Sequence, residues 1–136
     1  MRTKKYTKVI TQLRAVGVRP TRQRIALAKI LFNGDKRHIT AESLHMEALE
    51  ASIKVSLATV YNTLYLFTNA GILRDVVVDS NKRYFDTNTA EHHHFYFEDS
   101  NQLADISVDD IAVTKLPAIP ASKNLRRIDV VVRVSG

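Results

Sequence analysis

The sequence predicts an α+β protein with two parts. Residues 1–83 are expected to form a winged helix-turn-helix domain, and residues 84–136 a small α/β dimerisation domain with a short antiparallel sheet. Three observations carry this prediction: four amphipathic helical stretches followed by a hairpin, three short strand-like runs after them, and a basic first part before an acidic second part. A chain of 136 residues forms one ordinary domain or two small ones.

Apolar residues recur at helical spacing in four stretches: KKYTKVITQLRAVG, TRQRIALAKILFNG, ITAESLHMEALEAS and VSLATVYNTLYLFTNAG. The expected N-cap residues of the second, third and fourth helices are Thr21, Thr40 and Ser56, each at or near the start of its stretch. The first, second and fourth stretches each end in a glycine, the residue that is favoured just after a helix C-terminus. Only a few residues separate the last two stretches, which is the spacing of a helix-turn-helix.

A hairpin is expected next, in ILRDVVVDSNKRYFD, because two apolar runs flank the turn residues Asp79, Ser80 and Asn81. After a helix-turn-helix, such a hairpin is typical of a wing. Arg74, Lys82 and Arg83 lie on it, and the last two are candidate DNA contacts.

Charge is distributed unevenly along the chain. Residues 1–83 hold 15 Lys and Arg against 6 Asp and Glu, a net charge of +9, whereas residues 84–136 have a net charge of −3. The basic part predicts binding to a polyanion, here double-stranded DNA. Random clustering of surface charge is the alternative.

Polar side chains gather near the start of the fourth helical stretch, the expected recognition helix. They are Ser56, Thr59, Tyr61, Asn62 and Tyr65. Asn can bond adenine through two hydrogen bonds, and an aromatic edge can contact a thymine methyl. The alternative places Tyr61 and Tyr65 in a core or interface instead, and it applies more to Tyr65 than to Tyr61.

The second part contains the strand-like runs HHHFYFED, QLADISV and RRIDVVVRV. Pro117 and Pro120 prevent the intervening segment from continuing as a helix. This part is too small to bury a core of its own, so we expect a sheet shared across a homodimer, which also suits paired DNA half-sites.

Three of the five histidines are consecutive. In a strand, His92 and His94 point to one face and His93 to the other. Two imidazoles at this spacing form half of a metal site, which His38, Asp86 and Asp105 could complete. A polar strand without any ligand role is the alternative.

The composition indicates a cytoplasmic protein that does not enter a membrane. No apolar run is long enough to cross a bilayer, and the basic start leads into no secretory signal. The sequence has no Cys, which excludes disulfides, thiolate zinc sites and a thiol nucleophile.

The motifs RPTRQR, TAESL and LATVYNTLYLFTNAGIL, with the later His cluster, resemble the ferric uptake regulator family of bacterial metalloregulators. The resemblance covers nearly the whole chain from about Leu13. It implies a dimeric winged-helix DNA-binding protein whose regulatory metal site falls on His38, Asp86, His92, His94 and Asp105. It also implies that Tyr61 contacts bases and Arg19 the adjacent minor groove.

Two branches of the family share features with this chain. HHHFYFED, KLPAIP and RIDVVVRV look most like the iron response regulator (Irr) branch, where a His run is associated with haem, so His92, His93 and His94 are candidate haem ligands. Asp86 and Asp105 stand where iron sensors usually carry Glu, which resembles the peroxide regulator (PerR) branch. There, bound Fe(II) reacts with peroxide and a ligand His is oxidised.

The expected function is therefore a metal-dependent transcriptional repressor of iron and haem homeostasis, with peroxide sensing as the alternative. The expected ion is Fe(II) or Mn(II), since hard carboxylates accompany imidazoles. The structural four-cysteine zinc site of many family members is not expected, because Phe97 and Ser100 occupy the positions of its first cysteine pair. A non-haem metal enzyme and a pure interaction module are less favoured, and no residue is assigned a catalytic role.

Overall fold

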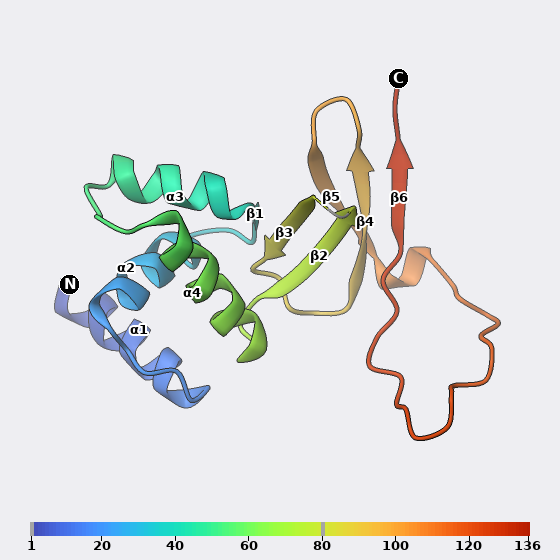
Figure 1. The fold of residues 1–136 in the computed structure, drawn as a ribbon, viewed down its shortest axis with the longest axis horizontal. Helices are drawn as coiled ribbons and strands as arrows, with labels where there is room; N and C mark the ends of the chain where they lie inside the picture. The colour runs from blue at the N-terminus through green and yellow to red at the C-terminus, as the bar shows by residue number, and fades with distance from the viewer. Residues whose placement is uncertain (1, 80) are drawn as a thin grey trace. The chain divides into compact units, whose positions relative to one another are not determined.

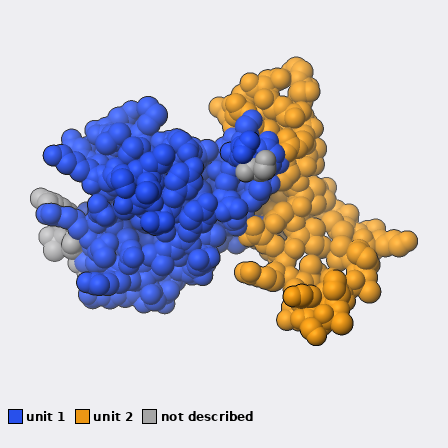
Figure 2. All heavy atoms as spheres, in the orientation of Figure 1, with its two compact units in different colours: residues 1–89 blue, residues 90–136 orange. Residues whose placement is uncertain are grey.

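The computed structural model describes residues 2–79 and 81–136, with side chains from Lys8 onward. The chain divides into two compact units after Thr89, which Figure 2 shows in blue and orange. The sequence placed the boundary after Arg83 instead. The first unit extends further because its last strand continues to Asp86 and pairs with two other strands of the same unit.

The first unit is a winged helix (Figure 1). In chain order its elements are α1 (Arg2–Ala15), α2 (Arg22–Leu31), β1 (His38–Ile39), α3 (Ala41–Glu50), α4 (Leu57–Asn69), β2 (Arg74–Asp79) and β3 (Lys82–Asp86). The strands form an antiparallel sheet in the order β1-β3-β2. The β2–β3 hairpin is the predicted wing; of its turn, Ser80 lies outside the described residues, and Asp79 accepts a hydrogen bond from the Asn81 backbone at 3.1 Å.

Helix starts follow the sequence prediction. The Thr21 hydroxyl accepts from the Arg24 amide at 3.3 Å and begins α2. Thr40 begins α3 through a capping box with Ser43, and Ser56 begins α4. Each cap satisfies backbone N–H groups that have no partner within the helix and contributes about 1 kcal/mol.

One apolar core holds the helices and the sheet of the first unit together. It includes side chains that are wholly inaccessible to solvent: Leu27, Leu44, Ala48, Val60, Leu64, Phe67 and Phe85. Burying each large side chain of this kind stabilises the fold by about 1.5–3 kcal/mol. Because α3, α4 and β3 all contribute, the recognition helix and the strand that ends at Asp86 belong to one rigid body.

The second unit is a three-stranded sheet. It contains β4 (His92–Phe97), β5 (Gln102–Ser107), a 3₁₀ turn η1 (Val108–Asp110) and β6 (Val131–Val134), in the order β5-β4-β6. The β4–β5 pair is antiparallel, as predicted, but β6 runs parallel to β4. Residues 111–130 form no helix or strand, and this long connection returns the chain to the same end of β4, which makes the parallel pairing reachable.

Within the described residues, no helix combines the length and apolar character needed to span a membrane.

Candidate metal centre and nucleic-acid interface

The first unit contributes two of the five predicted metal ligands, and it brings them together. His38 on β1 is the strand partner of Asp86 at the end of β3. The His38 Nε2 atom lies 3.1 Å from the Asp86 carboxylate, which is wholly buried. The Asn88 amide donates to the same carboxylate at 2.8 Å. A carboxylate buried in this way needs positive charge or hydrogen-bond donors around it.

Positive charge also enters this region from β2. Arg74 is the strand partner of Asp86 on the other side of β3, and only 7% of its surface is exposed. The sequence placed Arg74 on the wing without assigning it a DNA contact, and the residue does lie on β2 of that hairpin. Its side chain is buried, and the register places it on the same face of the sheet as Asp86.

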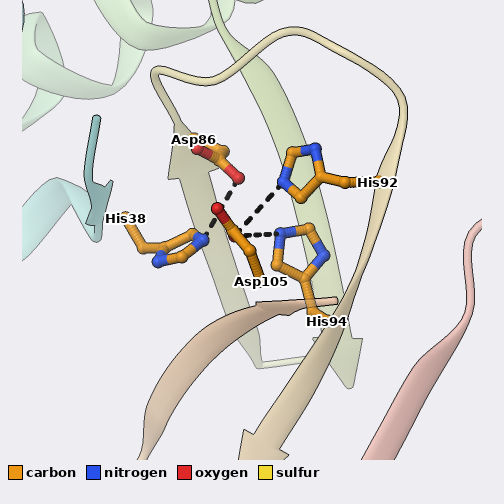
Figure 3. A group of neighbouring side chains, drawn as sticks. All are labelled: His38, Asp86, His92, His94 and Asp105. Carbon is orange, nitrogen blue, oxygen red and sulfur yellow. Dashed lines mark ion pairs between the residues drawn. The ribbon is translucent and has the colours of Figure 1, made fainter. Parts of the chain in front are cut away.

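The second unit contributes the other three predicted ligands. His92 and His94 lie on one face of β4, as the strand spacing predicted, with ring centroids 4.5 Å apart. Asp105 on β5 is the strand partner of His94. Its carboxylate lies 3.3 Å from His92 Nε2 and 3.5 Å from His94 Nε2 (Figure 3). The three side chains therefore form a preassembled cluster within one hairpin.

The tautomer of His92 follows from its neighbour in the chain. Its Nδ1 atom lies 2.6 Å from the Ala90 carbonyl oxygen. A carbonyl oxygen can only accept, so Nδ1 carries the proton and donates. Nε2, which faces Asp105, is then the nitrogen that offers a lone pair when the ring is neutral. Metal-binding histidines are commonly oriented in this way by a backbone carbonyl.

The donor set fits a hard divalent ion. All five side chains offer an imidazole nitrogen or a carboxylate oxygen as a ligand atom, and none offers a thiolate (Figure 3). Three imidazoles with two carboxylates suit Fe(II) and Mn(II), although Zn(II) competes in raw affinity.

His93 differs from its two neighbours. It points to the opposite face of β4, and its Nδ1 atom accepts a hydrogen bond from the Val130 amide at 3.2 Å. This bond ties β4 to the residue before β6. The three candidate haem ligands, His92, His93 and His94, are all at least nine-tenths buried. Of the three, His93 could bind a haem iron through Nδ1 only by giving up its hydrogen bond from Val130.

The candidate DNA contacts of α4 divide into two groups. The Ser56 hydroxyl accepts from the Thr59 amide at 3.1 Å and donates to the Thr59 hydroxyl at 2.9 Å, so both hydroxyls are used in the helix cap. Asn62 is exposed on the surface of α4, and Tyr61 is half-buried beside it. These two side chains are better placed to contact bases.

A polar groove of about 430 Å³ runs beside Asn62, between α4 and the start of α2. Its lining includes Thr21, Gln23 and Arg24, which the sequence reasoning did not assign to the interface. The polar run TRQR could have indicated a second set of DNA contacts, but the sequence analysis interpreted it only as the start of a helix. Hydroxyl, amide and guanidinium groups at this position suit a phosphate backbone.

The remaining candidate contacts are basic and exposed: Arg19 before α2, and Lys82 and Arg83 on the wing. The Arg19 carbonyl accepts from the Arg24 guanidinium at 3.0 Å, which fixes the backbone there. The Arg83 guanidinium lies over the Tyr65 ring, 5.4 Å from its centroid. Wing and recognition helix therefore contact each other through this pair.

The chain joins a winged helix to a small sheet unit, and both units carry imidazole and carboxylate groups that could bind a metal ion. These features place it in the class of winged-helix proteins with a candidate metal site. The profile of the ferric uptake regulator family matches residues 15–134, and the chain belongs to that family. The resemblance inferred from the sequence is confirmed at this level.

Curated relatives carry two kinds of name. The chain is 30% identical over 115 residues to a ferric uptake regulation protein of Vibrio vulnificus, covering 84% of this chain and 76% of that one. It is 32% identical over 96 residues to the peroxide-responsive repressor PerR of Staphylococcus epidermidis, covering 71% and 63%. A ferric uptake regulation protein of Bordetella parapertussis is 32% identical over 61% of this chain and 60% of its own length. The matches thus span less than two thirds of the last two relatives.

Solved structures share the fold. The ferric uptake regulator of Vibrio cholerae superposes with a TM-score of 0.72 at 20% identity, over 93% of this chain and 98% of that one. The ferric uptake regulator of Pseudomonas aeruginosa, solved with manganese, gives a TM-score of 0.69 at 22% identity, over 93% and 96%. The predicted α+β fold class is confirmed.

Proposed function

We propose that this protein is a metal-dependent, DNA-binding transcriptional regulator, acting mainly as a repressor in iron and haem homeostasis. It would act in the cytoplasm as a homodimer on a double-stranded operator. One observation carries the proposal: the DNA-binding unit supplies the pair His38 and Asp86, and the sheet unit supplies the cluster of His92, His94 and Asp105.

The five residues would together hold one Fe(II) or Mn(II) ion, whose double positive charge would offset the two carboxylates. Neither unit offers all five donors. Complete ligation therefore requires residues of both, and the bound protein would hold its two units in one arrangement. Two recognition helices of a dimer match successive major grooves only when that arrangement is fixed. DNA affinity would then depend on the metal.

Known proteins of the same family support this reading. The relatives named above are a peroxide-responsive repressor and ferric uptake regulation proteins, and one of the similar structures was solved with manganese. Basic charge on the winged-helix part supports nucleic-acid binding independently of any relative.

The direct test is a gel-shift measurement with the full chain. Duplexes that bind in the presence of Mn(II) would first be selected from a randomised pool. We expect tight binding with Mn(II) or with Fe(II) under anaerobic conditions, and weaker binding after chelation. Equal affinity with and without the ion would remove metal dependence from the proposal.

Peroxide sensing is the second candidate function. It is favoured by the two Asp ligands and by the match to peroxide-responsive repressors. The burial of His92, His93 and His94 disfavours a haem input that uses them. Adding haem to the Mn(II)-loaded complex, and peroxide to the Fe(II)-loaded complex, separates the two. Release of DNA by haem supports the Irr-like proposal, whereas release by peroxide, with oxygen added to a ligand His in the mass spectrum, supports the PerR-like one.

Arg19→Ala is expected to weaken DNA binding, and the loss should shrink as salt rises. The exposed guanidinium would contact phosphates in or beside the minor groove, and such a contact releases counterions. The slope of log K against log salt should become shallower by about one. Fluorescence anisotropy across a salt series measures this.

Arg126→Ala is the matched control, because it removes the same charge from an exposed position in the sheet unit. It should leave the slope nearly unchanged. If the two variants had the same slope, Arg19 would have no local role in DNA binding.

A further inference from the structure

Tyr61 does not extend freely from the recognition helix. Its hydroxyl donates a hydrogen bond to the Glu42 carboxylate at 2.5 Å. Glu42 lies in the first turn of α3, nineteen residues earlier in the chain, so the bond crosses from one helix of the helix-turn-helix to the other. This hydrogen bond, and the burial that accompanies it, raise the pKa of Tyr61 above its ordinary value. The phenol therefore stays protonated, and its proton stays directed at the carboxylate.

The ring of Tyr61 is held from its other side as well. It stacks on Tyr65, one turn later on α4, with centroids 6.2 Å apart and planes inclined by 22°. Tyr65 in turn contacts the edge of Phe85 on β3, and the Arg83 guanidinium lies over it. The Glu42 carboxylate, the two tyrosine rings and the Arg83 guanidinium thus form a continuous row of contacts. These contacts leave the Tyr61 side chain little freedom to rotate.

We propose that Glu42 is a specificity-determining residue: by accepting the hydroxyl proton of Tyr61, it leaves only lone pairs on that oxygen for DNA, so that the protein selects a base with an amino group at this position. The inference rests on the proposed DNA-binding function and refines it. Glu42 acts through Tyr61 and is a positioning residue.

The selection follows from the hydrogen-bonding groups of the major groove. Adenine and cytosine present amino donors there, whereas guanine presents only acceptors and thymine an acceptor and a methyl group. An ionised carboxylate can only accept, so the bond to Glu42 has one direction. A tyrosine hydroxyl without this partner could turn and donate to guanine or thymine as readily as it accepts from adenine or cytosine.

Glu42→Gln tests this direction. A glutamine side chain has nearly the same shape but can donate as well as accept, which frees the Tyr61 proton for DNA. Selection from a randomised duplex pool with Mn(II), followed by sequencing, gives the base preference at each position for the full-length wild type and the variant. At one position per half-site we expect wild type to prefer adenine or cytosine roughly tenfold. In Glu42→Gln that preference should disappear while neighbouring positions keep theirs.

Three comparisons test whether the effect of Glu42→Gln comes from the changed direction of this hydrogen bond or only from the loss of a negative charge. Glu50→Gln removes the same charge from the exposed end of α3 and should keep the preference. Tyr61→Phe should lose the preference at the same position, and adding Glu42→Gln to it should change nothing further there. The ionisation of Tyr61, followed by its NMR signals, should shift to lower pH in Glu42→Gln.

The outcomes distinguish this inference from the proposed function. If wild type selects no duplex at all, DNA binding itself is refuted. If wild type selects a sequence and Glu42→Gln selects the same one with equal discrimination, the role of Glu42 is refuted and the proposed function stands.

Discussion

Asp105→Ala is expected to lower Mn(II) affinity by more than about 100-fold, since loss of outer hydrogen-bond partners alone costs roughly 10- to 100-fold. The carboxylate contacts both His92 and His94, so its removal takes away one proposed ligand and a group that orients two others. Metal-dependent DNA binding should disappear with it. Isothermal titration with Mn(II), followed by gel shift at fixed metal concentration, measures both effects.

His94→Ala should produce the same two losses. Asp109→Ala is the matched control, because it removes an exposed carboxylate only a few residues beyond Asp105 and should leave Mn(II) affinity unaltered. Unchanged metal affinity in both Asp105→Ala and His94→Ala would contradict the assignment of this cluster as the regulatory site.

Phe97→Glu should convert the proposed homodimer into monomers and raise its dissociation constant by more than about 100-fold, because an unpaired charge buried in an interface costs several kcal/mol. Phe95 and Phe97 extend from one face of β4, are 38% and 39% exposed, and are strand partners of Val132 and Val134 on β6. Four apolar side chains on one sheet face are what a zinc-free dimer would bury. Light scattering at micromolar concentration measures the change.

Val113→Glu is the control for Phe97→Glu. Val113 is equally apolar and 44% exposed, but it lies in the connection between η1 and β6. Its substitution should leave the mass unchanged. A wild-type protein that is monomeric at this concentration would overturn the proposed dimer, whatever the variants do.

Much of the first unit could be predicted because its signals are local. Thr21, Thr40 and Ser56 begin helices, and each does so through hydrogen bonds to residues three positions later. The His92 and His94 pair was also predictable, since strand alternation alone places both on one face. The assignment of all five candidate ligands rests on this spacing and on the family resemblance, and it stays a prediction.

Other features depended on packing between distant segments, which spacing does not encode. Arg74 looked like a wing cation, but the register opposite Asp86 buries it. The bond between Tyr61 and Glu42 joins two helices, so it depends on how those helices pack, which neither helical pattern predicts. The parallel direction of β6 depends on the path of residues 111–130, which carry no periodic pattern.

That path has a consequence for the order in which the sheet folds. The β4–β5 hairpin closes a short turn, which takes on the order of 1–10 µs, whereas β6 must close a far longer loop at greater entropic cost. The His94 and Glu98 amides donate to the carbonyls of Val130 and Val134, at 3.1 and 2.9 Å, so their protection awaits the later step. Pulsed hydrogen exchange during refolding should show these two amides protected after those of β5, and simultaneous protection would contradict this order. His92, His94 and Asp105 all belong to the early hairpin, so a nascent chain would carry these candidate metal ligands before its sheet is complete.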